Sequence, residues 1–552
     1  MSTSFSLRGH VVDLHNREIQ PSVVHVEDGR ILRIDDSDGT VPDRYILPGF
    51  VDAHVHVESS MLTPSEFARA AVTHGTVATV SDPHEIANVL GVPGVVYMLK
   101  DGADVPFTFA FGAPSCVPAT PFETSGAELD AEAVARLLER DDVLYLSEVM
   151  NYPGVIDRAP DLMAKIDAAK RRGKPVDGHA PGLRGDGVLA YAGAGVETDH
   201  ECVTIDEARE KLDAGMKILI REGSAAKNFD ALIPLMAEAP DHLMFCSDDK
   251  HPDALVEGHI DDLVRRAIDL GHDRFDVLRA ACIHPVEHYG LDVGLLRQGD
   301  PADLIVVRDL ETFDVLETYV RGQQVASRGE TQIPRKESPV VNRFAASPVE
   351  AEAFRVVAPA PDAFRIRVIE ASDNQLVTGE GQVETAIRDG AVVAEPSRDV
   401  LKIAVVNRYR DAEPAVAFVR GFGLTEGAIA SSVAHDSHNI VAVGASDEAL
   451  ARAINAVIDA KGGVAAVGRG TTRLLPLPIA GLMSDRPYPE VARRYTALSQ
   501  FVQQDLGSPM DAPFMTLSFM ALLVIPKLKL SDQGLFDGES FEFVGLGVED
   551  LR

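Results

Sequence analysis

The sequence predicts an α/β protein built on a (β/α)8 barrel of the TIM type, with a small composite β-domain and a C-terminal α/β domain. Three observations lead to this prediction. Short apolar runs alternate with helix-like stretches through the middle of the chain, similar β-rich segments flank that region, and a polar linker precedes the last part. The 552 residues are long enough for about three such units.

The small β-domain is expected to combine both flanks of the middle region. Residues 1–45 contain short strand-like runs, and Asp28-Gly29 marks a hairpin turn between two of them. A similar pattern returns within residues 291–330. We therefore expect residues 1–45 and 291–330 to form one domain.

The barrel is expected over residues 46–290, which contain eight strand-like runs with helical patterns between them. The runs are 46–56, 75–82, 106–113, 143–149, 175–179, 196–200, 217–222 and 243–248. Residues 329–345 are polar, contain two prolines and are expected to form a linker. Residues 346–552 mix strand-like and helical patterns and are expected to form the C-terminal α/β domain.

Composition limits the partners and the location of the protein. The net charge is −33, and such a surface repels phosphate backbones and anionic lipids, so we expect neither nucleic-acid nor membrane partners. Acidic excess with few lysines is typical of salt-adapted proteins, although high genomic GC content also favours arginine over lysine. Four widely spaced cysteines and an N-terminus without a secretory signal pattern indicate a cytoplasmic protein.

Metal-binding side chains occur at the carboxyl ends of the predicted strands, where the active sites of such barrels lie. His54 and His56 form an HxH pair at the end of the first strand, and residues two apart on a strand share one face. Further strands end with Glu148, His179, His200 and Asp248. This pattern predicts a metal site at the barrel mouth.

The ligand set predicts two divalent ions per subunit. Four histidines and two carboxylates exceed a single catalytic site, which uses three protein ligands and a water molecule. Glu148 has two oxygens and can bridge two ions. Nitrogen and oxygen ligands without thiolate suit Mn or Fe, and also Zn.

Several sequence blocks resemble those of the adenine deaminases of the amidohydrolase superfamily. In chain order they are LPGFVDAHVHVESSML, SDPHEIANVLG, SEVMNYPGV, DGHAPGL, ETDHE, REGSAAKN and SDDKHPD. The later block GFGLTEGAIASSVAHDSHNIVAVG resembles the C-terminal domain of that family. The resemblance therefore covers essentially the whole chain.

The resemblance also assigns the metal ligands one by one. The matching positions are His54, His56, Glu148, His179, His200 and Asp248. Glu148 matches the glutamate that bridges the metals in this family, in place of the carbamylated lysine of many relatives. The sequence agrees, because no lysine lies between Lys100 and Lys165.

The reaction implied by the resemblance is hydrolysis of adenine to hypoxanthine and ammonia, as part of purine salvage. A metal-activated hydroxide attacks C6, and Asp248 carries a proton from it to the leaving ammonia. A ring nitrogen also gains a proton, for which Glu222 and the His84–Glu85 pair are the catalytic candidates. His84 alternatively orders the loop after the second strand.

Substrate contacts are expected from two further groups. Arg221 lies at the end of the seventh strand and Ser224 follows that strand. The alternative role of Arg221 is a structural or gating cation, and that of Ser224 is a helix cap. His435, Asp436 and His438 are expected to close over the barrel mouth, from the same or a neighbouring subunit. Their alternative is an ordered polar loop or a surface metal contact.

Two other functions compete with deamination. One is an amidohydrolase that opens a cyclic amide or removes an acyl group, which generally has a lysine bridge or other pocket residues. The other is a non-catalytic binding barrel, and the six retained ligands argue against it. We expect a homo-oligomer, because such barrels with an added α/β domain often assemble.

Overall fold

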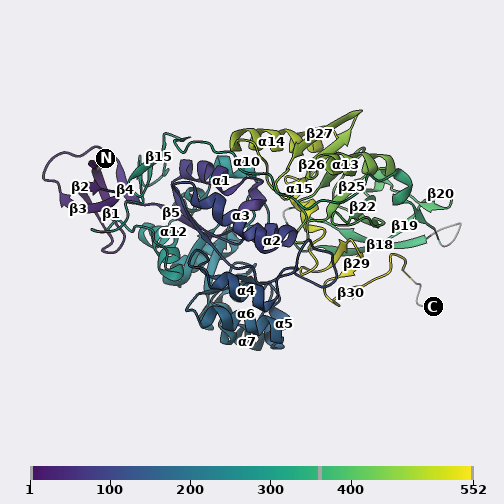
Figure 1. Ribbon diagram of the computed structural model, residues 1–552, viewed down its shortest axis with the longest axis horizontal. Coiled ribbons are helices and arrows are strands. Elements are labelled where there is room, and N and C mark those ends of the chain that lie inside the picture. Colours follow the sequence, from purple (N-terminus) through teal and green to yellow (C-terminus); the bar gives the residue numbers. More distant parts are fainter. Residues whose placement is uncertain (1–3, 359–363, 374, 549–552) are drawn as a thin grey trace.

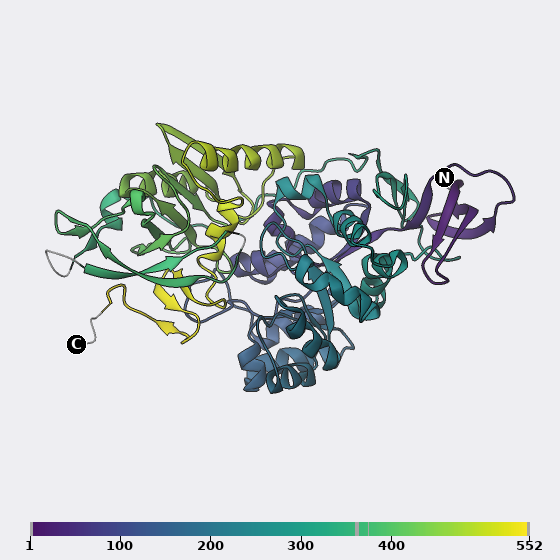
Figure 2. The same cartoon turned by 180° about the vertical axis from the view of Figure 1, so that it is seen from behind.

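The computed structural model of the chain describes residues 4–358, 364–373 and 375–548. Three parts follow one another along the long axis of the molecule (Figures 1 and 2). A β-sheet with the N-terminus lies at one end, strands surrounded by helices lie in the middle, and a second α/β part lies at the other end. Within the described residues, no helix has both the length and the apolar character needed to cross a membrane.

Eight parallel strands form a closed ring in the middle part. They are β5 (Phe50–Val55), β6 (Thr76–Ser81), β7 (Thr108–Phe111), β8 (Leu146–Val149), β9 (Val176–Gly178), β10 (Thr198–Asp199), β11 (Lys217–Arg221) and β12 (Leu243–Cys246). They pair within three sheets, and backbone contacts join the sheets. Ala113 bridges Leu146, the Glu197 amide donates to the Val176 carbonyl, and Val55 bridges Asp248. The last contact connects the eighth strand with the first.

Helices between these parallel strands, and three more after the last strand, cover the ring from outside. They are α1 (Pro64–Ala71), α2 (His84–Leu90), α3 (Val92–Ala103), α4 (Ala131–Leu138), α5 (Tyr152–Ile156), α6 (Pro160–Lys170), α7 (Asp186–Ala194), α8 (Ile205–Asp213), α9 (Phe229–Leu232), α10 (Pro252–Glu257), α11 (Ile260–Asp269) and α12 (Arg274–Tyr289). This arrangement is the expected (β/α)8 barrel.

The N-terminal sheet combines strands from both flanks of the barrel. Its order is β16-β15-β14-β13-β4-β1-β2-β3. The bounds are β1 (Ser4–Asp13), β2 (Glu18–Glu27), β3 (Arg30–Asp36), β4 (Tyr45–Pro48), β13 (Leu304–Val307), β14 (Val315–Val320), β15 (Gln323–Ser327) and β16 (Glu330–Thr331). Asp28 and Gly29 join β2 to β3 with φ values of 49° and 78°, the left-handed conformations that a tight hairpin requires.

The run expected as one strand over 46–56 is divided between two sheets. Its first part is β4 of the N-terminal sheet and its second part is β5 of the barrel. Gly49 lies between them, and a Cβ atom there would be 2.3 Å from Cγ1 of Val77. A glycine at this point therefore lets the chain pass close to the barrel as it changes sheets.

The C-terminal part is a mixed sheet with helices. The order of its strands is β19-β18-β23-β22-β25-β24-β26-β27. Their bounds are β18 (Phe364–Glu370), β19 (Gly379–Thr385), β22 (Leu401–Val406), β23 (Ala415–Arg420), β24 (Ala428–Ser431), β25 (Ile440–Gly444), β26 (Gly463–Gly468) and β27 (Thr471–Pro476). The main helices are α13 (Asp447–Asp459), α14 (Tyr488–Gln504) and α15 (Pro513–Phe519).

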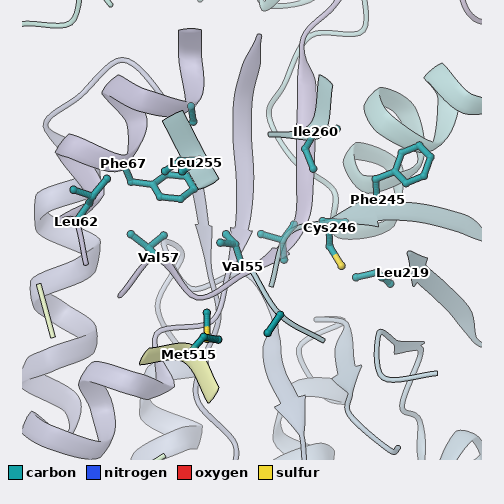
Figure 3. Close-up of a cluster of buried hydrophobic side chains, with 14 of the residues drawn as sticks. Val55, Val57, Leu62, Phe67, Leu219, Phe245, Cys246, Leu255, Ile260 and Met515 are labelled. Carbon is teal, nitrogen blue, oxygen red and sulfur yellow. The ribbon is translucent and has the colours of Figure 1, made fainter. Parts of the chain in front are cut away.

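The hydrophobic core continues from the barrel into the C-terminal part. Val55, Leu219 and Phe245 are fully buried barrel residues or nearly so. Met515 of α15 is also fully buried and belongs to the same cluster (Figure 3). The C-terminal part is therefore packed against the barrel through apolar side chains, which places its loops over the barrel.

Candidate active site at the barrel mouth

A small cavity lies where the carboxyl ends of the barrel strands meet the C-terminal part. Its volume is about 30 Å³, enough for about two water molecules. The barrel contributes mainly polar side chains: His56, His84, Glu85, Glu148, His179, Glu201, Asp248 and Asp249, with Met150, Ala225 and Ala226. The C-terminal part contributes Leu376, His435, Asp436, Phe519 and Leu522. Both parts of the chain thus build this site.

Three of the expected ligands converge on one point from β5 and the loop after β12. The Nε2 atoms of His54 and His56 are 3.3 Å apart, and they lie 3.6 Å and 3.2 Å from Oδ1 of Asp248. Two ligand atoms bound to one tetrahedral metal at about 2.1 Å lie about 3.4 Å apart. The three atoms therefore have the separation that a shared divalent ion requires.

Glu148 stands between this group and a second pair of histidines. Its Oε1 is 3.2 Å from Nε2 of His56. Its Oε2 is 2.7 Å from Nδ1 of His179 and 3.2 Å from Nε2 of His200. Each carboxylate oxygen thus faces a different histidine group, which is the arrangement of a bridging ligand.

The charge states of the carboxylates also suit a metal. Burial raises the pKa of Glu148, but the contacting histidines outweigh burial and hold this pKa well below its usual range. Burial likewise raises the pKa of Asp248, but the contacts with Arg221, His54 and His56 outweigh burial and hold this pKa well below its usual range. Both groups are ionised at neutral pH, as carboxylate ligands must be.

The backbone orients His56 from behind. Its Nδ1–H donates to the carbonyl of Asp82 at 3.2 Å, which leaves Nε2 to face the ligand cluster. Such contacts commonly fix the tautomer of a metal-binding histidine. Asp82 also groups with His56, His84 and Glu148 as a set that could hold an ion.

Arg221 is buried between two carboxylates. Its Nη1 donates to Oδ2 of Asp248 at 2.7 Å, and the guanidinium also pairs with both oxygens of Glu201. Its Nε donates to the carbonyl of Ala226 at 2.7 Å. These contacts make Arg221 a support for Asp248. Arg221 does not line this cavity but lines a second one that adjoins it.

His84 and Glu85 lie at the start of α2 and face the C-terminal part. Nδ1 of His84 is 3.1 Å from Oδ2 of Asp82, and its Nε2 is 3.8 Å from Oδ1 of Asp436. Oε1 of Glu85 is 2.5 Å from Nδ1 of His435, and Oε2 contacts Nε2 of His438. The expected cluster of His435, Asp436 and His438 therefore reaches the barrel mouth within one chain.

Glu222 and Ser224 do not reach this cavity. Arg221 points inward from the end of β11, so the next residue points outward, and Glu222 pairs with Nη1 of Arg266 at 2.9 Å. Oγ of Ser224 accepts a hydrogen bond of 2.8 Å from the backbone N–H of His251, the residue that precedes α10. Both line a separate cavity of about 460 Å³ between the barrel and α14. The expected proton-donor role of Glu222 and the substrate contact of Ser224 therefore disagree with their positions.

The sequence reasoning missed Glu201, Asp82 and Asp249. Glu201 directly follows the expected ligand His200, and its partner Arg221 comes from another strand. Asp249 follows Asp248 and its Oδ1 accepts a hydrogen bond from Oγ of Ser59 at 2.5 Å. Asp82 follows the second strand, so the strand-end rule that found the other residues also signalled this one.

A second cavity of about 230 Å³ adjoins the first. The two share Glu201, Ala226 and Leu376 in their walls. The rest of its lining combines the charged Arg221 and Lys227 with mainly uncharged residues such as Val203, Val377 and Ile525. It therefore extends the site along the boundary between the barrel and the C-terminal part.

A parallel barrel with an HxH pair, two further strand-end histidines and two carboxylates at its mouth is the arrangement of a metal-dependent hydrolase. Residues 45–325 match the model of the amidohydrolase family, and residues 375–542 match that of the adenine deaminase C-terminal domain. Members of the amidohydrolase family generally use divalent metal.

Relatives match over the full length of the chain. The adenine deaminase of Salinibacter ruber (strain DSM 13855 / M31) is 71% identical over 550 residues, covering 100% of both chains. That of Sulfurovum sp. (strain NBC37-1) is 56% identical and covers 98% of this chain and 99% of its own. That of Methanosarcina mazei is 51% identical, with coverage of 98% and 99%. The chain therefore belongs to the adenine deaminase family of the amidohydrolases.

Proposed function

We propose that this protein hydrolyses adenine to hypoxanthine and ammonia. The observation that carries the proposal is Glu148, whose two oxygens each face a different histidine group beneath a loop of the adenine deaminase C-terminal domain. The full-length relatives named adenine deaminase support the same activity. An amidohydrolase acting on a cyclic amide or an N-acyl substrate is the alternative.

The proposed metal site has two positions. His54, His56 and Asp248 would hold one divalent ion, His179 and His200 the other, and Glu148 would contact both. Mn or Fe suits these nitrogen and oxygen ligands, and Zn is a third option. When bound, the ions lower the pKa of a water molecule so that it can attack a ring carbon at neutral pH.

Asp248 is proposed to move the protons around the amino group of the substrate. Its carboxylate is ionised, buried and held by Arg221, so it can accept a proton from the attacking water. It then gives this proton to the amino nitrogen as the bond from C6 breaks and ammonia leaves. A carboxylate in this position therefore acts first as a base and then as an acid.

The substrate is proposed to occupy space beyond the small cavity. A purine does not fit into 30 Å³, whereas the adjoining 230 Å³ cavity continues the site along the domain boundary. Asp436 and His435 face the reacting end, and Leu376 lies in the wall that both cavities share. We infer that the C-terminal segments shift to admit the base and then enclose it.

The proposal is tested by measuring ammonia release from adenine, cytosine and guanine together with the metal content of the purified enzyme. We expect release from adenine alone and about two divalent ions per chain. Removal of the metal with a chelator should abolish the activity, and Mn²⁺ or Fe²⁺ should restore it. Release from cytosine or guanine but not from adenine would contradict the proposal.

Replacing Asp248 provides the matching variant. Asp248→Asn should lower kcat by at least about 100-fold, because Asn can neither accept nor deliver the proton. Asp241→Asn changes an exposed carboxylate far from the cavity and should leave kcat unchanged. Circular dichroism checks the fold of both variants, and full activity of Asp248→Asn would refute the role of Asp248.

We also propose a cytoplasmic homo-oligomer that acts in purine salvage. The four cysteines are free and buried, which suits a reducing compartment. Light scattering of the purified enzyme measures the oligomeric state, and a monomer would contradict this part of the proposal.

A further inference from the structure

The buried imidazole of His435 is fixed at one nitrogen and open at the other. Its Nδ1 is 2.5 Å from Oε1 of Glu85. Its Nε2 is buried and has no hydrogen-bond partner among the described residues. Oδ1 of Asp249 lies 4.0 Å from this nitrogen, beyond hydrogen-bonding distance. His435 is therefore a cavity-lining histidine with one nitrogen available to a bound molecule.

Glu85 is itself held in place by a second histidine. The amide of Ala434 donates to Nδ1 of His438 at 3.2 Å, so the proton of a neutral His438 is on Nε2. That Nε2–H donates to Oε2 of Glu85. Both oxygens of Glu85 are thus engaged by histidines from the C-terminal part, and the carboxylate is fixed against His435.

Hydrolysis at C6 of adenine requires a group of this kind. When the water oxygen bonds to C6, the C6=N1 double bond becomes a single bond and N1 gains an electron pair. N1 must then bind a proton, and it keeps this proton in hypoxanthine. Because N1 is bonded to C6, its proton donor must line the same cavity as Asp248.

We propose that His435 is the catalytic acid that protonates N1 of adenine, and that Glu85 and His438 are its positioning residues. This inference rests on the proposed function. His435 transfers the Nε2 proton to N1 as the C6–O bond forms. One proton of the attacking water passes through Asp248 to the departing amino group, and the other returns His435 to its starting state. The products are hypoxanthine and ammonia, and all atoms balance.

His84 is the competing donor, and its contacts argue against that role. Its Nδ1 lies 3.4 Å from Oε1 of Glu148, the carboxylate between the two proposed metal positions. Its Nε2 faces carboxylate oxygens of Glu85 and Asp436 at 3.5 Å and 3.8 Å. Nε2 of His84, like Nε2 of His435, has no hydrogen-bond partner among the described residues. The two histidines differ in their other nitrogen, because Nδ1 of His84 faces the proposed bridging carboxylate whereas Nδ1 of His435 faces Glu85.

The test compares His435→Gln and His435→Asn with the wild-type enzyme in adenine turnover. General acids commonly contribute about 10²–10⁴-fold, so kcat should fall at least about 100-fold. Metal content should change less than about threefold, because His435 is not among the proposed metal ligands. KM should change much less than kcat, because the transferred proton acts in the chemical step. His15→Asn, an exposed histidine of the N-terminal sheet, is the control and should retain wild-type kcat.

Glu85→Gln tests the positioning role. We expect a lower kcat with unchanged metal content, and the double variant Glu85→Gln/His435→Gln should be no slower than His435→Gln alone. Residues that act as a unit give such non-additive losses. A purely structural effect of Glu85 would instead add to the loss caused by His435→Gln.

Three results would overturn the inference. They are a His435 variant with kcat within threefold of wild type, loss of metal from both His435 variants, and a loss of kcat confined to His84→Asn. Circular dichroism and metal analysis show whether each variant is folded and loaded. A wild-type enzyme that releases no ammonia from adenine would defeat the proposed function itself, which is a separate outcome.

Discussion

At the residue scale, a buried arginine supports the cluster of expected metal ligands. Arg221 pairs with Asp248 and Glu201, and both carboxylates are almost fully buried. A buried carboxylate without a partner is costly, so the arginine allows two of them to stand side by side. It therefore keeps Asp248 ionised and in position on the side away from His54 and His56.

Lys529 offers a pH-dependent test at the same scale. Its buried Nζ donates to the carbonyls of Leu376 at 2.6 Å and Phe519 at 2.9 Å, which belong to the two segments over the cavity. Burial lowers its pKa from 10.5 to about 7. Between these values the unfolded chain binds one more proton than the folded chain, so stability should rise with pH by about 1.4 kcal/mol per unit.

Lys529→Met should lose this rise. The Tm of wild type minus that of the variant should therefore increase from pH 7.5 to pH 9, as measured by thermal unfolding at several pH values. Lys227→Met, at a half-exposed lysine, should show no comparable trend. A Tm difference that is constant or decreases with pH would contradict the assigned shift.

The expected ligands were predictable because the carboxyl ends of parallel strands meet at one face. Their positions followed from local sequence once the strands were located. Glu222 was misplaced because side chains alternate along a strand, and inward Arg221 leaves Glu222 facing Arg266. The pairing of Arg221 with Glu201 joins different strands, and a single sequence carries little signal for such a contact.

At the scale of elements, two segments of the C-terminal part, around Leu376 and Phe519, lie over the barrel mouth. Leu376 lies in the wall between the two cavities, and Phe519 at the end of α15 lies over the smaller one. Their backbone carbonyls are held together by Lys529. We therefore expect substitutions here to affect binding of the base more than the chemical step.

Leu376→Trp tests this expectation. The larger ring should fill part of the 230 Å³ cavity, raise KM for adenine by about tenfold or more, and change kcat less. Steady-state kinetics with adenine measure both constants, and Leu189→Trp on the exposed face of α7 is the matched control. Unchanged KM, or a loss confined to kcat, would show that the base does not pass this wall.

Element boundaries were less predictable than element types. The Asp28-Gly29 turn was expected from residue chemistry alone, since these residues tolerate positive φ. The division of the 46–56 run between two sheets could not be expected in the same way. It depends on the close packing of Gly49 against Val77, a residue of the next strand. The hydrophobic pattern of a run predicts that the run is buried, but it does not indicate to which sheet each part of the run belongs.

At the scale of the whole molecule, the net charge of −33 has no counterpart in the site. The carboxylates of the cavity are paired with histidines or with Arg221, so the excess acidity belongs elsewhere in the chain. Repulsion among like charges destabilises a compact protein, and salt screens charges at the surface. Adenine is neutral near pH 7, so this acidity neither attracts nor repels the proposed substrate.

We expect the Tm to rise by several degrees between about 0.1 M and 2 M KCl, as measured by thermal unfolding. A variant with Asp38, Asp43 and Glu128 changed to their amides should show a smaller rise, because these exposed carboxylates have no ion-pair partner among the described residues and contribute to the repulsion. A wild-type Tm that does not depend on salt would contradict the hypothesis of a salt-adapted surface.

The shared core of the barrel and the C-terminal part has a consequence for how this chain can be divided. Met515 packs near the barrel residues Val55 and Val57 (Figure 3), and Met515 and Phe519 belong to one hydrophobic core that joins barrel residues to the C-terminal part. Cutting the gene after the linker would expose that apolar surface and remove the histidines that hold Glu85. The barrel is therefore not an independent module, and an engineered protein that uses this site would need both the barrel and the C-terminal part.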